Sequence, residues 1–465
     1  MNLFGTAGIR KIYPDEVNPH LAYRLGLAVA EVVGGGNGYL VHDTRITSPA
    51  LSLAFMSGLM AGGMNAFYIG LAPTPIAAYA SMWHGRLGVS VTASHNPPEY
   101  NGFKFYDHEG YEYTRRLEER IESVINEAKE REWFRSGKFY FSPEIVDEYI
   151  EDAAARLEPE KKTIEPRIVL DLANGAGSTV TPTILRKIGA RVYTINGDPD
   201  GFFKARHPEP RKDVLEKFLP AYKAFNPDLV LAHDGDADRL AALSPRTGFI
   251  RQDRLIAFYA ALMLRERRGT IVVSVDTGRV IDEVVERLGG RVERCRLGKI
   301  HEKLKEIGAS NVVLAAEPWK LIDPVWGPWV DGIWQAGLLT KAIIEEGKPL
   351  DELLEAMNIP DYPWDRRSYR IEPKDLLNRV YQGVVEGLSE ALGEPSNVLK
   401  IDGVRCEYED YSWILVRMSG TEPKIRIYAE AKSHKRLREI IDKEEGLLVK
   451  TLESCGGKVI EKSIG

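Results

Sequence analysis

Cysteine is scarce in this chain, and its spacing excludes two kinds of site. The 465 residues include three cysteines, Cys295, Cys406 and Cys455, an odd number that lie far apart without any Cys-x-x-Cys spacing. A disulfide framework needs paired cysteines in an oxidising compartment, and a zinc site needs closely spaced ligands. The sequence therefore predicts neither of them and favours a reducing, cytoplasmic location.

The chain also lacks a continuous apolar segment that could cross a membrane. Residues 50–83 carry no charge, but several glycines, Asn65, Pro73 and Pro75 interrupt them. The pieces are shorter than the ~20 apolar residues that a transmembrane helix needs. We interpret the segment as a helix, a strand and a second helix buried in an α/β domain. Residues 1–10 lack the basic-then-apolar pattern of a secretory signal, so no membrane partner is expected.

An excess of positive charge is absent as well. The net charge of −6 gives no reason to expect nucleic acid or an anionic membrane as a partner. A phosphorylated ligand would therefore have to be bound by local cationic groups.

The turn Asn174-Gly175-Ala176-Gly177 follows a predicted strand, but it is not a G-x-G-x-x-G motif, so a dinucleotide site has weak support.

Helical and strand patterns alternate through most of the chain, which favours sheets of mostly parallel strands with crossover helices. The length is sufficient for three or four domains. Ser142 and Pro143 predict a helix N-cap and first turn, with the helix running to about Leu157. We predict three α/β domains with mixed, mostly parallel sheets and a smaller C-terminal α+β domain, over residues 1–142, 143–244, 245–360 and 361–465.

One serine is placed where a predicted strand ends. Alternating apolar and small residues from Leu87 to Ala93 are typical of a strand, and Pro97 and Pro98 cannot continue one. Ser94 is therefore expected on a loop at a strand end, where α/β proteins place their chemistry. A serine beside Asn-Pro can also do no more than cap a turn.

Three aspartates, Asp234, Asp236 and Asp238, occupy alternate positions after a predicted strand over residues 228–232. In extended backbone, alternate side chains share one side, so we expect the three carboxylates to converge. A hard divalent cation would compensate their charge. A calcium helix-loop-helix is excluded, because its sixth and twelfth positions would be Arg239 and Pro245 instead of Gly and Glu. A solvated acidic turn is the alternative.

A third polar loop lies near the C-terminus. The string Arg417-Met418-Ser419-Gly420-Thr421-Glu422-Pro423 joins two strand-like runs. One arginine, two hydroxyl groups and the backbone N–H groups of a glycine loop make a concave phosphate clamp. An ordinary hairpin loop is the alternative, although it would not require Arg, Ser and Thr together.

The three loops resemble those of the α-D-phosphohexomutases, a family that includes phosphoglucomutase, phosphomannomutase and phosphoglucosamine mutase. Thr-Ala-Ser-His-Asn-Pro around Ser94 is similar to the family's serine loop. Asp-Gly-Asp-Ala-Asp-Arg from Asp234 to Arg239 is similar to its magnesium loop, and the Arg417 loop to its phosphate-binding loop. The resemblance implies three related α/β domains, a phosphoryl group on Ser94, and Mg²⁺ held by Ser94 and the three aspartates.

Further site residues follow from the same resemblance. Lys104 matches a lysine beside the nucleophile, and Arg10 matches another active-site cation. Arg239 is expected to neutralise the transferring phosphoryl group, and Arg426 to support the phosphate-binding loop. Without the resemblance, Arg10 would be interpreted as a surface arginine. Two further matches, Asp43-x-Arg45 and Pro208-Glu209-Pro210, are taken to be mainly structural.

The loop that reads the sugar departs from the family. Relatives commonly have Gly-Glu-x-Ser-Gly-His, whereas this chain has Ala-Glu-Pro-Trp-Lys-Leu from Ala316 to Leu321. Glu317 stays a candidate for hydrogen bonds to sugar hydroxyls. Trp319 offers either an apolar face to the sugar or a packing side chain. Lys299 lies where relatives carry His or Asp beside the substrate. The missing histidine leaves the general acid or base open.

We predict a phosphosugar mutase, an isomerase that moves a phosphoryl group between C6 and C1 of glucose, mannose or glucosamine phosphate. The reaction would pass through phosphoserine and a sugar bisphosphate, with Mg²⁺ as cofactor. The alternatives are a phosphopentomutase of the same fold, a sugar-phosphate phosphatase and a non-catalytic sugar-phosphate-binding paralogue. The sequence does not decide between a monomer and a homo-oligomer.

Overall fold

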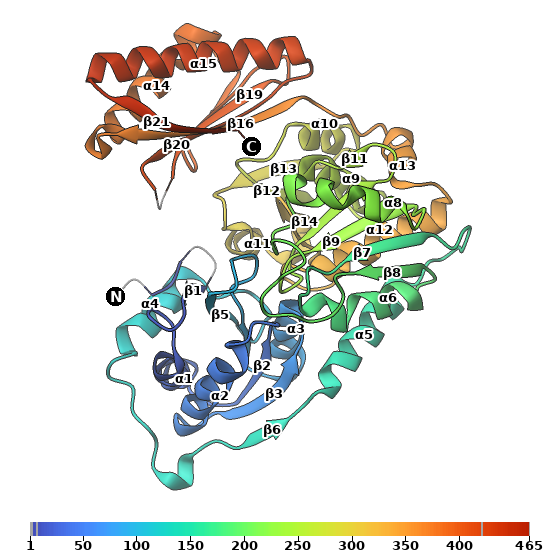
Figure 1. The fold of residues 1–465 in the computed structure, drawn as a ribbon, viewed down its shortest axis with the longest axis vertical. Helices are drawn as coiled ribbons and strands as arrows, with labels where there is room; N and C mark the ends of the chain where they lie inside the picture. Colours follow the sequence, from blue (N-terminus) through green and yellow to red (C-terminus); the bar gives the residue numbers. More distant parts are fainter. Residues whose placement is uncertain (1–2, 6–7, 420–421, 465) are drawn as a thin grey trace.

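The computed structural model describes residues 3–5, 8–419 and 422–464. Four sheets follow one another along the chain, each with its own helices. Figure 1 shows the first three units packed against one another and the C-terminal unit set apart at one end. The fold is thus three units with mixed sheets and a C-terminal unit of a different kind, as the sequence predicts.

The first sheet has the order β1-β5-β4-β2-β3-β6. Its last four strands in this order, β4, β2, β3 and β6, are parallel to one another. Residues 50–83 form the predicted helix, strand and helix. The strand before Ser94 ends at Val91, two residues earlier than predicted, because the chain already turns there. The elements are β1 (Ile9–Ile12), α1 (Pro19–Val33), β2 (Asn37–His42), α2 (Ser48–Ala61), β3 (Asn65–Leu71), α3 (Thr74–His84), β4 (Leu87–Val91), β5 (Tyr100–Tyr106), α4 (Arg115–Val124) and β6 (Phe139–Phe141).

The second sheet has the order β11-β10-β9-β7-β8, with β9, β7 and β8 parallel and β10 and β11 antiparallel. The elements are α5 (Glu144–Leu157), β7 (Arg167–Asp171), α6 (Thr181–Lys187), β8 (Arg191–Ile195), α7 (Lys212–Leu215), α8 (Leu219–Lys223), β9 (Leu229–His233), β10 (Leu240–Ser244) and β11 (Gly248–Phe249). Because β11 belongs to this sheet, we propose that the second domain extends to about residue 250.

The predicted helix cap at Ser142 is wrong. Pro143 occupies the N-cap position of α5 without a side-chain hydrogen bond, and the helix begins at Glu144. The backbone N–H of Ser142 instead donates to the carbonyl oxygen of Tyr68 at 2.9 Å. Ser142 therefore ends the ladder between β3 and β6 and lies one residue before the N-cap position.

The third sheet has the order β13-β12-β14-β15, with three parallel strands and the short antiparallel β15. Helix α12 packs against α5 and α6 of the second unit, and one apolar core runs through both units. The elements are α9 (Gln252–Glu266), β12 (Thr270–Ser274), α10 (Val280–Arg287), β13 (Arg291–Cys295), α11 (Ile300–Ile307), β14 (Val312–Glu317), β15 (Lys320–Ile322), α12 (Gly332–Glu346) and α13 (Leu350–Ala356).

The C-terminal sheet is antiparallel throughout, in the order β17-β18-β19-β20-β16-β21, and α14 and α15 cover one of its faces (Figure 1). Strand β21 is not predicted from the sequence, because its polar residues form a strand only by pairing with β16. The elements are β16 (Trp364–Glu372), α14 (Leu377–Leu392), β17 (Asn397–Leu399), β18 (Val404–Glu407), β19 (Trp413–Met418), β20 (Lys424–Glu430), α15 (His434–Cys455) and β21 (Lys458–Ile464).

Short 3₁₀ turns complete the described chain: η1 (Trp133–Arg135), η2 (Ala176–Thr179), η3 (Glu216–Phe218), η4 (Ala309–Asn311) and η5 (Lys374–Leu376).

Buried charged groups join the C-terminal unit to the third unit. Arg405 is fully buried, and its Nη1 donates to the carbonyl oxygens of Val275 at 2.7 Å and Thr277 at 2.6 Å. Glu430, equally buried, accepts from the backbone N–H of Arg279 at 2.7 Å. Buried charges without such partners are costly, so these bonds stabilise the contact between the two units.

Candidate active site

Ser94 lies in the connection between β4 and β5, and its side chain is fully buried. The hydroxyl donates to Oδ2 of Asp234 at 2.8 Å and lies 3.3 Å from Nδ1 of His95. The backbone of Ser94 is left-handed, with φ of 53°. Such a conformation is unfavourable for a residue other than glycine, so the surrounding contacts must maintain it.

Arg45 supplies several of those contacts. Its buried guanidinium donates to the carbonyl oxygens of Ser94 at 3.0 Å and Tyr100 at 2.9 Å, the two ends of the serine loop. Its Nε pairs with Oδ2 of Asp43 at 2.9 Å, and Thr92 donates to the same oxygen at 2.7 Å. The Asp43–Arg45 pair therefore positions the serine loop, in line with the structural role expected for it.

The three aspartates lie between β9 and β10, and each offers a carboxylate oxygen within 4.8 Å of the others. All three are buried. The extended backbone that we predicted for this loop is wrong. Ala237 is left-handed, with φ of 57°, and the chain reverses into antiparallel β10. The carboxylates thus converge around a turn.

Burial raises the pKa of Asp234 well above its usual value, and the neighbouring carboxylates of Asp236 and Asp238 raise it further. Oδ1 of Asp236 and Oδ1 of Asp238 are buried and have no hydrogen-bond partner among the described residues. Unpaired buried oxygens of this kind are costly unless something compensates them. The donor set therefore fits a hard divalent cation such as Mg²⁺.

Lys104 lies against the same cluster. Its Nζ donates to Oδ2 of Asp236 at 2.7 Å and to Oδ2 of Asp238 at 2.5 Å. Burial by itself would lower the pKa of Lys104, but the two carboxylates outweigh it and raise this pKa to about 12. Lys104 is therefore an ammonium ion in contact with the acidic cluster.

Two arginines approach the serine and aspartate loops. The backbone N–H of Arg239 donates to Oδ1 of Asp234 at 3.2 Å, and its Nη1 donates to Oε1 of Glu209 at 3.2 Å. Nη1 of Arg10 lies 3.5 Å from Nδ1 of His95. Burial, followed by the charges of Arg239 and Arg10, lowers the pKa of His95. His95 is thus a neutral imidazole beside Ser94.

The serine and aspartate loops approach each other at backbone level. A Cβ on Gly235 would lie 2.6 Å from the carbonyl oxygen of Ser94, so only glycine fits there. Thr74, at the start of α3, donates from its backbone N–H to the carbonyl oxygen of Asp236 at 3.0 Å and from its hydroxyl to Oδ2 of Asp236 at 2.6 Å. The site is therefore assembled between the first and second units.

Sequence reasoning missed three residues of this arrangement. His95 belongs to the serine string but received no role of its own, and Thr74 carries no local signal. Glu209 was noted only within a Pro-Glu-Pro string, whereas it pairs with Arg239 at 3.2 Å. The Pro-Glu-Pro string could have indicated Glu209, and the position next to Ser94 could have indicated His95.

In the divergent loop predicted to read the sugar, Glu317 is buried at the end of β14, opposite Lys320 of β15. Its Oε1 accepts from the backbone N–H of Gly298 at 2.5 Å, and its Oε2 lies 3.6 Å from Nζ of Lys320. Burial raises the pKa of Glu317, and the charge of Lys320 opposes that rise. No role is predicted for Lys320 from the sequence, yet it also contributes positive charge at His95.

Trp319 and Lys299 are the other two residues predicted to lie beside the sugar. Trp319 is left-handed, with φ of 69°, and it is half-buried against the apolar cluster of the second sheet. Its backbone N–H donates to Oε1 of Gln252 at 2.9 Å. The packing interpretation of Trp319 thus matches its contacts. Lys299 pairs with Oε1 of Glu302 at 2.7 Å, and no contact with Glu317 is found within the described chain.

The phosphate-clamp string joins β19 and β20, with Arg417 directly opposite Arg426. Nη2 of Arg417 pairs with Oδ2 of Asp402 at 3.0 Å, whereas its Nε and Nη1 are buried without a partner in the described part of the chain. Ser419 donates its backbone N–H to the carbonyl oxygen of Lys424 at 2.9 Å. Two other predicted clamp residues, Gly420 and Thr421, lie outside the described residues.

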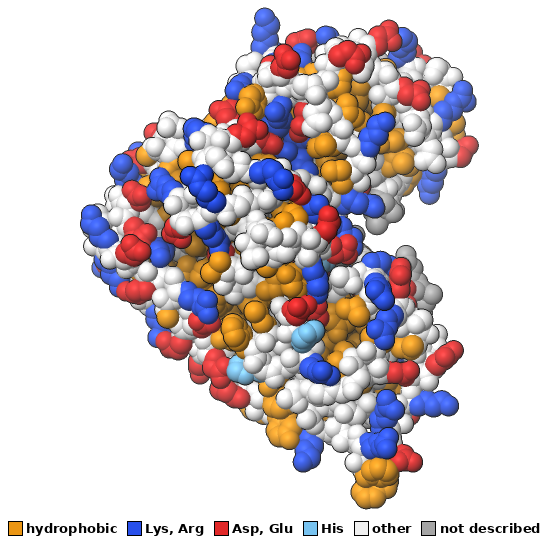
Figure 2. All heavy atoms as spheres, turned by 180° about the vertical axis from the view of Figure 1, so that it is seen from behind, with side chains coloured by type: hydrophobic (Ala, Val, Ile, Leu, Met, Phe, Trp, Pro, Cys, Tyr) orange, Lys and Arg blue, Asp and Glu red, His pale blue; other side chains and the backbone are white. Residues whose placement is uncertain are grey.

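The β19–β20 hairpin points from the C-terminal unit toward the side of the first unit where β1 and β5 lie (Figure 1). Figure 2 shows an open notch between the C-terminal unit and the rest of the molecule, bordered by charged side chains of both signs. The unpaired donors of Arg417 are suited to a phosphate group.

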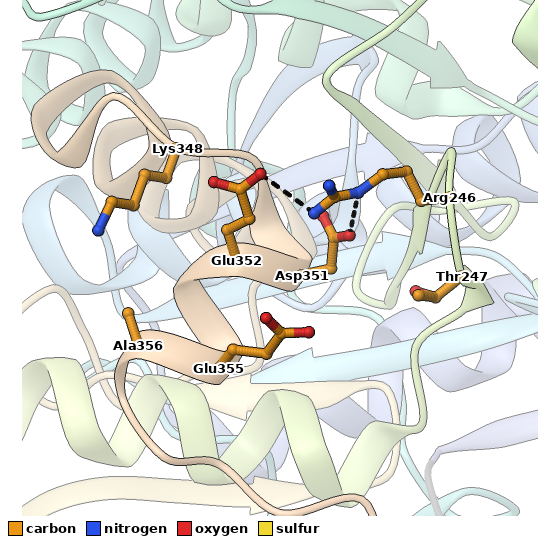
Figure 3. A pocket seen from close by; sticks show the side chains of 7 residues that line it. All are labelled: Arg246, Thr247, Lys348, Asp351, Glu352, Glu355 and Ala356. Atoms are coloured by element: carbon orange, nitrogen blue, oxygen red, sulfur yellow. Dashed lines mark hydrogen bonds and ion pairs between the residues drawn. The ribbon is translucent and has the colours of Figure 1, made fainter.

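A separate hollow of about 620 Å³ lies elsewhere and contains none of the predicted site residues (Figure 3). Nε of Arg246 donates to Oδ2 of Asp351 at 2.5 Å, and its Nη2 lies 3.2 Å from Glu352. Arg246, Asp351 and Glu352 pair with one another, and the hollow contains none of the serine, aspartate or clamp residues, so it is not a candidate for the chemistry. In the described segments, no helix has both the length and the apolar character needed to span a membrane.

The chain is similar to known proteins along nearly its whole length. It is 40% identical over 449 residues to the phosphopentomutase of Thermococcus kodakarensis, covering 95% of this chain and 96% of that protein. It is 38% identical over 445 residues to a probable phosphoglucosamine mutase of Methanopyrus kandleri, covering 94% and 96%.

Solved structures share the fold. A phosphoglucomutase/phosphomannomutase family protein of Burkholderia thailandensis superposes with a TM-score of 0.85 at 24% identity, over 98% of this chain and 99% of that one. An Aspergillus fumigatus N-acetylphosphoglucosamine mutase, solved with GlcNAc-6P and magnesium, has a TM-score of 0.63 at 15% identity, over 97% of this chain and 96% of that one.

Four family domains match in order. These are the phosphoglucomutase/phosphomannomutase alpha/beta/alpha domains I, II and III at residues 1–132, 147–247 and 251–359, and the C-terminal domain at residues 375–447. The chain therefore belongs to the phosphoglucomutase/phosphomannomutase family of α-D-phosphohexomutases, whose members are isomerases that act as intramolecular phosphotransferases.

Proposed function

We propose that this protein moves a phosphoryl group between C1 and the terminal carbon of an aldose phosphate, with Ser94 as the covalent carrier. The observation that carries the proposal is the hydrogen bond of 2.8 Å between the Ser94 hydroxyl and Asp234, which joins a nucleophile to a cation-binding cluster. Phosphoryl transfer depends chiefly on positioning and electrostatic stabilisation, and this arrangement supplies both.

In the first step, a hydroxyl of a sugar monophosphate attacks the phosphorus of phosphoserine and gives up its proton, the bond from phosphorus to Oγ of Ser94 breaks, Oγ takes up a proton, and a bisphosphate forms. In the second step, Oγ of Ser94 attacks the other phosphoryl group and loses its proton, while the bond from phosphorus to the sugar oxygen breaks and that oxygen takes up a proton. Two acceptors lie close enough to receive that proton, Oδ2 of Asp234 at 2.8 Å and the neutral Nδ1 of His95 at 3.3 Å.

Three cationic side chains, Arg10, Lys104 and Arg239, stabilise the negative charge of the transferring phosphoryl group. Asp234, Asp236, Asp238 and an oxygen on Ser94 would hold Mg²⁺. The ion would neutralise negative charge on the transferring group. Support for the cation comes from the two buried, unpaired carboxylate oxygens of Asp236 and Asp238.

The phosphate that does not react would be held by the C-terminal clamp of Arg417, Ser419 and Arg426. The clamp is supported by Nε and Nη1 of Arg417, which are buried donors without partners in the described structure. A guanidinium with free donors favours a phosphate because it can form two parallel hydrogen bonds with it.

Glu317 and Lys320 are proposed to bind the sugar hydroxyls, with Trp319 and Lys299 around them. The substrate is a hexose phosphate with transfer between C6 and C1, or a pentose phosphate with transfer between C5 and C1. The pentose has specific support, because the relative at 40% identity is named a phosphopentomutase and this chain lacks the family's usual serine and histidine in this loop.

The cysteine content supports a cytoplasmic location.

The proposal is tested by incubating the protein with Mg²⁺, a sugar bisphosphate activator and the 1-phosphates of glucose, mannose, glucosamine and ribose. Isomerisation to the terminal phosphate, without release of inorganic phosphate, is the expected result. Phosphate release in step with substrate loss would identify a phosphatase. Binding without turnover across the panel would identify a non-catalytic protein.

A further inference from the structure

The outer rim of the first unit carries an unusual concentration of exposed aromatic side chains. Figure 1 shows β6 and the turn η1 along this rim, and Figure 2 shows hydrophobic side chains gathered at the corresponding end of the molecule. Exposure is 89% for Trp133 and 61% for Phe134 in η1, and 49%, 40% and 63% for Phe139, Tyr140 and Phe141 in β6. Burial against other parts of the described chain does not account for them.

Strand β6 is also an open edge. It is the last strand of the first sheet, and among the described residues it pairs only with β3. The carbonyl oxygen of Lys138 accepts from Ala66 at 2.9 Å, and the N–H of Ser142 donates to Tyr68 at 2.9 Å. Because backbone groups alternate in direction along a strand, the N–H and C=O groups of Phe139 and Phe141 point away from β3.

Aromatic side chains lead to this edge on both faces of the sheet. On one face, Tyr140 stacks on Phe67 with ring centroids 4.6 Å apart, and Phe67 stacks on Tyr39 at the same distance. On the other face, Phe141 lies 6.1 Å from Tyr68. Both rows stop at the open edge. We propose that β6 pairs antiparallel with β6 of a second copy of this chain, around a twofold axis at Tyr140.

This register is self-complementary. Centring on Tyr140 places Phe139 of one copy opposite Phe141 of the other, and each Tyr140 opposite its counterpart. The outward N–H and C=O groups of Phe139 and Phe141 then meet as hydrogen-bonded pairs, which antiparallel geometry requires. Aromatic pairs on both faces stabilise the pairing, and the two sheets become continuous.

The flanking charges complement each other in the same arrangement. Exposed basic residues, Arg135 and Lys138, precede β6, and exposed acidic residues, Glu144 and Asp147, follow it at the start of α5. Antiparallel pairing turns the basic end of one strand toward the acidic end of the other. A parallel arrangement would bring like charges together, so the charges also select the orientation.

The area is sufficient for a stable pair. An aromatic side chain buries ~150–250 Å², so the exposed fractions of the five residues amount to on the order of 600 Å² per copy. Two copies would bury at most on the order of 1,200 Å², the lower end of the range for specific interfaces, and β6 supplies about half of this area. A patch of this size is at the upper limit for an ordinary monomer surface, ~300–600 Å².

The test is sedimentation velocity of the full chain over a range of micromolar concentrations. A dimer is expected, and Phe139→Lys should raise its dissociation constant at least about tenfold, since a charge at a strand edge opposes pairing. Val449→Lys, which replaces an equally exposed apolar residue on α15, is the matched control and should leave the dimer unchanged. A wild-type monomer at all concentrations, or a dimer unaffected by Phe139→Lys, would overturn the proposal.

Single-cysteine crosslinking tests the register without relying on destabilised variants. Cys455 is first replaced by Ser; Cys295 and Cys406 are buried. Tyr140→Cys should form an intermolecular disulfide, because residues opposite each other at a non-hydrogen-bonded position have Cα atoms ~4.5 Å apart. Phe141→Cys should not, because the same residues of the two copies would exceed the ~7 Å that a disulfide spans. Equal crosslinking of both variants would refute the twofold axis at Tyr140.

Discussion

The hydroxyl of Ser94 donates a hydrogen bond of 2.8 Å to Oδ2 of Asp234, a residue 140 positions later in the chain. The bond joins the serine loop of the first unit to the aspartate loop of the second. Neither unit contains the complete site, so the packing of the two units is a condition of the proposed chemistry. Gly235 permits the approach, because a Cβ there would lie 2.6 Å from the carbonyl oxygen of Ser94.

Replacing Ser94 by alanine should abolish mutase turnover, because no phosphoryl carrier remains. We expect a loss of at least ~10⁴-fold in kcat, as for other lost nucleophiles. Ser81→Ala is the control, since that buried hydroxyl donates only to the carbonyl oxygen of Ala78 within its own helix. Mass spectrometry after incubation with a bisphosphate should detect phosphate on Ser94 in the parent protein. Full activity of Ser94→Ala would refute the carrier role.

Removal of Mg²⁺ by a chelator should stop turnover, and added Mg²⁺ should restore it. In Asp236→Asn, the dissociation constant for Mg²⁺ should rise at least about tenfold, because one anionic ligand is lost. Calorimetric titration of Mg²⁺ measures this without relying on activity. The exposed Asp213→Asn is the control. Unchanged Mg²⁺ binding in Asp236→Asn would exclude the aspartate loop as the metal site.

Lys320→Met should lower kcat/KM for the true substrate about tenfold or more, because a charge-assisted hydrogen bond contributes about 1.5–3 kcal/mol. Lys320 lies 3.6 Å from Glu317, in the loop proposed to bind the sugar. Lys299→Met is the comparison. If Lys299 only pairs with half-exposed Glu302, its loss should change kcat/KM little. A larger effect of Lys299→Met would place the sugar on that side of the loop.

Stability should fall as pH rises toward alkaline values because of Glu444. Both of its carboxylate oxygens are buried without partners among the described residues, and burial, followed by the charge of Glu445, raises its pKa to about 8. The protonated form is the one that suits the folded state. Its contribution is therefore complete below pH 4.5, the ordinary value, and is lost as pH rises through about 8.

Glu444→Gln should remove this dependence and raise the melting temperature most at alkaline pH. Glu445→Gln is the opposite control. Burial by itself would raise the pKa of Glu445, but its bonds to Lys462, Tyr369 and Arg367 lower it to about 2. Its contribution is present above pH 4.5 and is lost as pH falls toward about 2. Thermal unfolding across pH distinguishes the two, and an unaltered alkaline slope in Glu444→Gln would contradict the assignment.

Asp331→Ala should destabilise the protein by about 3 kcal/mol or more, because several buried donors would lose their acceptor. Oδ2 of Asp331 accepts from Tyr149 at 2.6 Å, Trp326 at 2.8 Å and Trp329 at 3.2 Å. Oδ1 caps α12 by accepting from two backbone N–H groups. Asp331→Asn keeps an oxygen acceptor, so a smaller loss is expected by denaturant unfolding. Equal losses in the two variants would show that the charge, and not the acceptor, is what matters.

The serine, aspartate and phosphate loops were predicted from local strings, because the chemistry proposed for each loop depends on residues adjacent in sequence. The alternation of helix and strand patterns was likewise sufficient for the α/β units. It was not sufficient for β21, which becomes a strand by pairing with β16. The cap at Ser142 failed because the helix begins one residue later than predicted, with Pro143 at its N-cap position.

The sequence by itself indicated the side chains that we propose to carry the chemistry: Ser94, the three aspartates and Arg417. The tertiary structure alone decided how they are arranged. The turn into β10, and not extended backbone, brings the carboxylates together. Lys104 neutralises Asp236 and Asp238 from another unit, and Glu209 orients Arg239. These contacts join residues far apart in the chain, so their distances follow from packing between units, which local periodicity does not record.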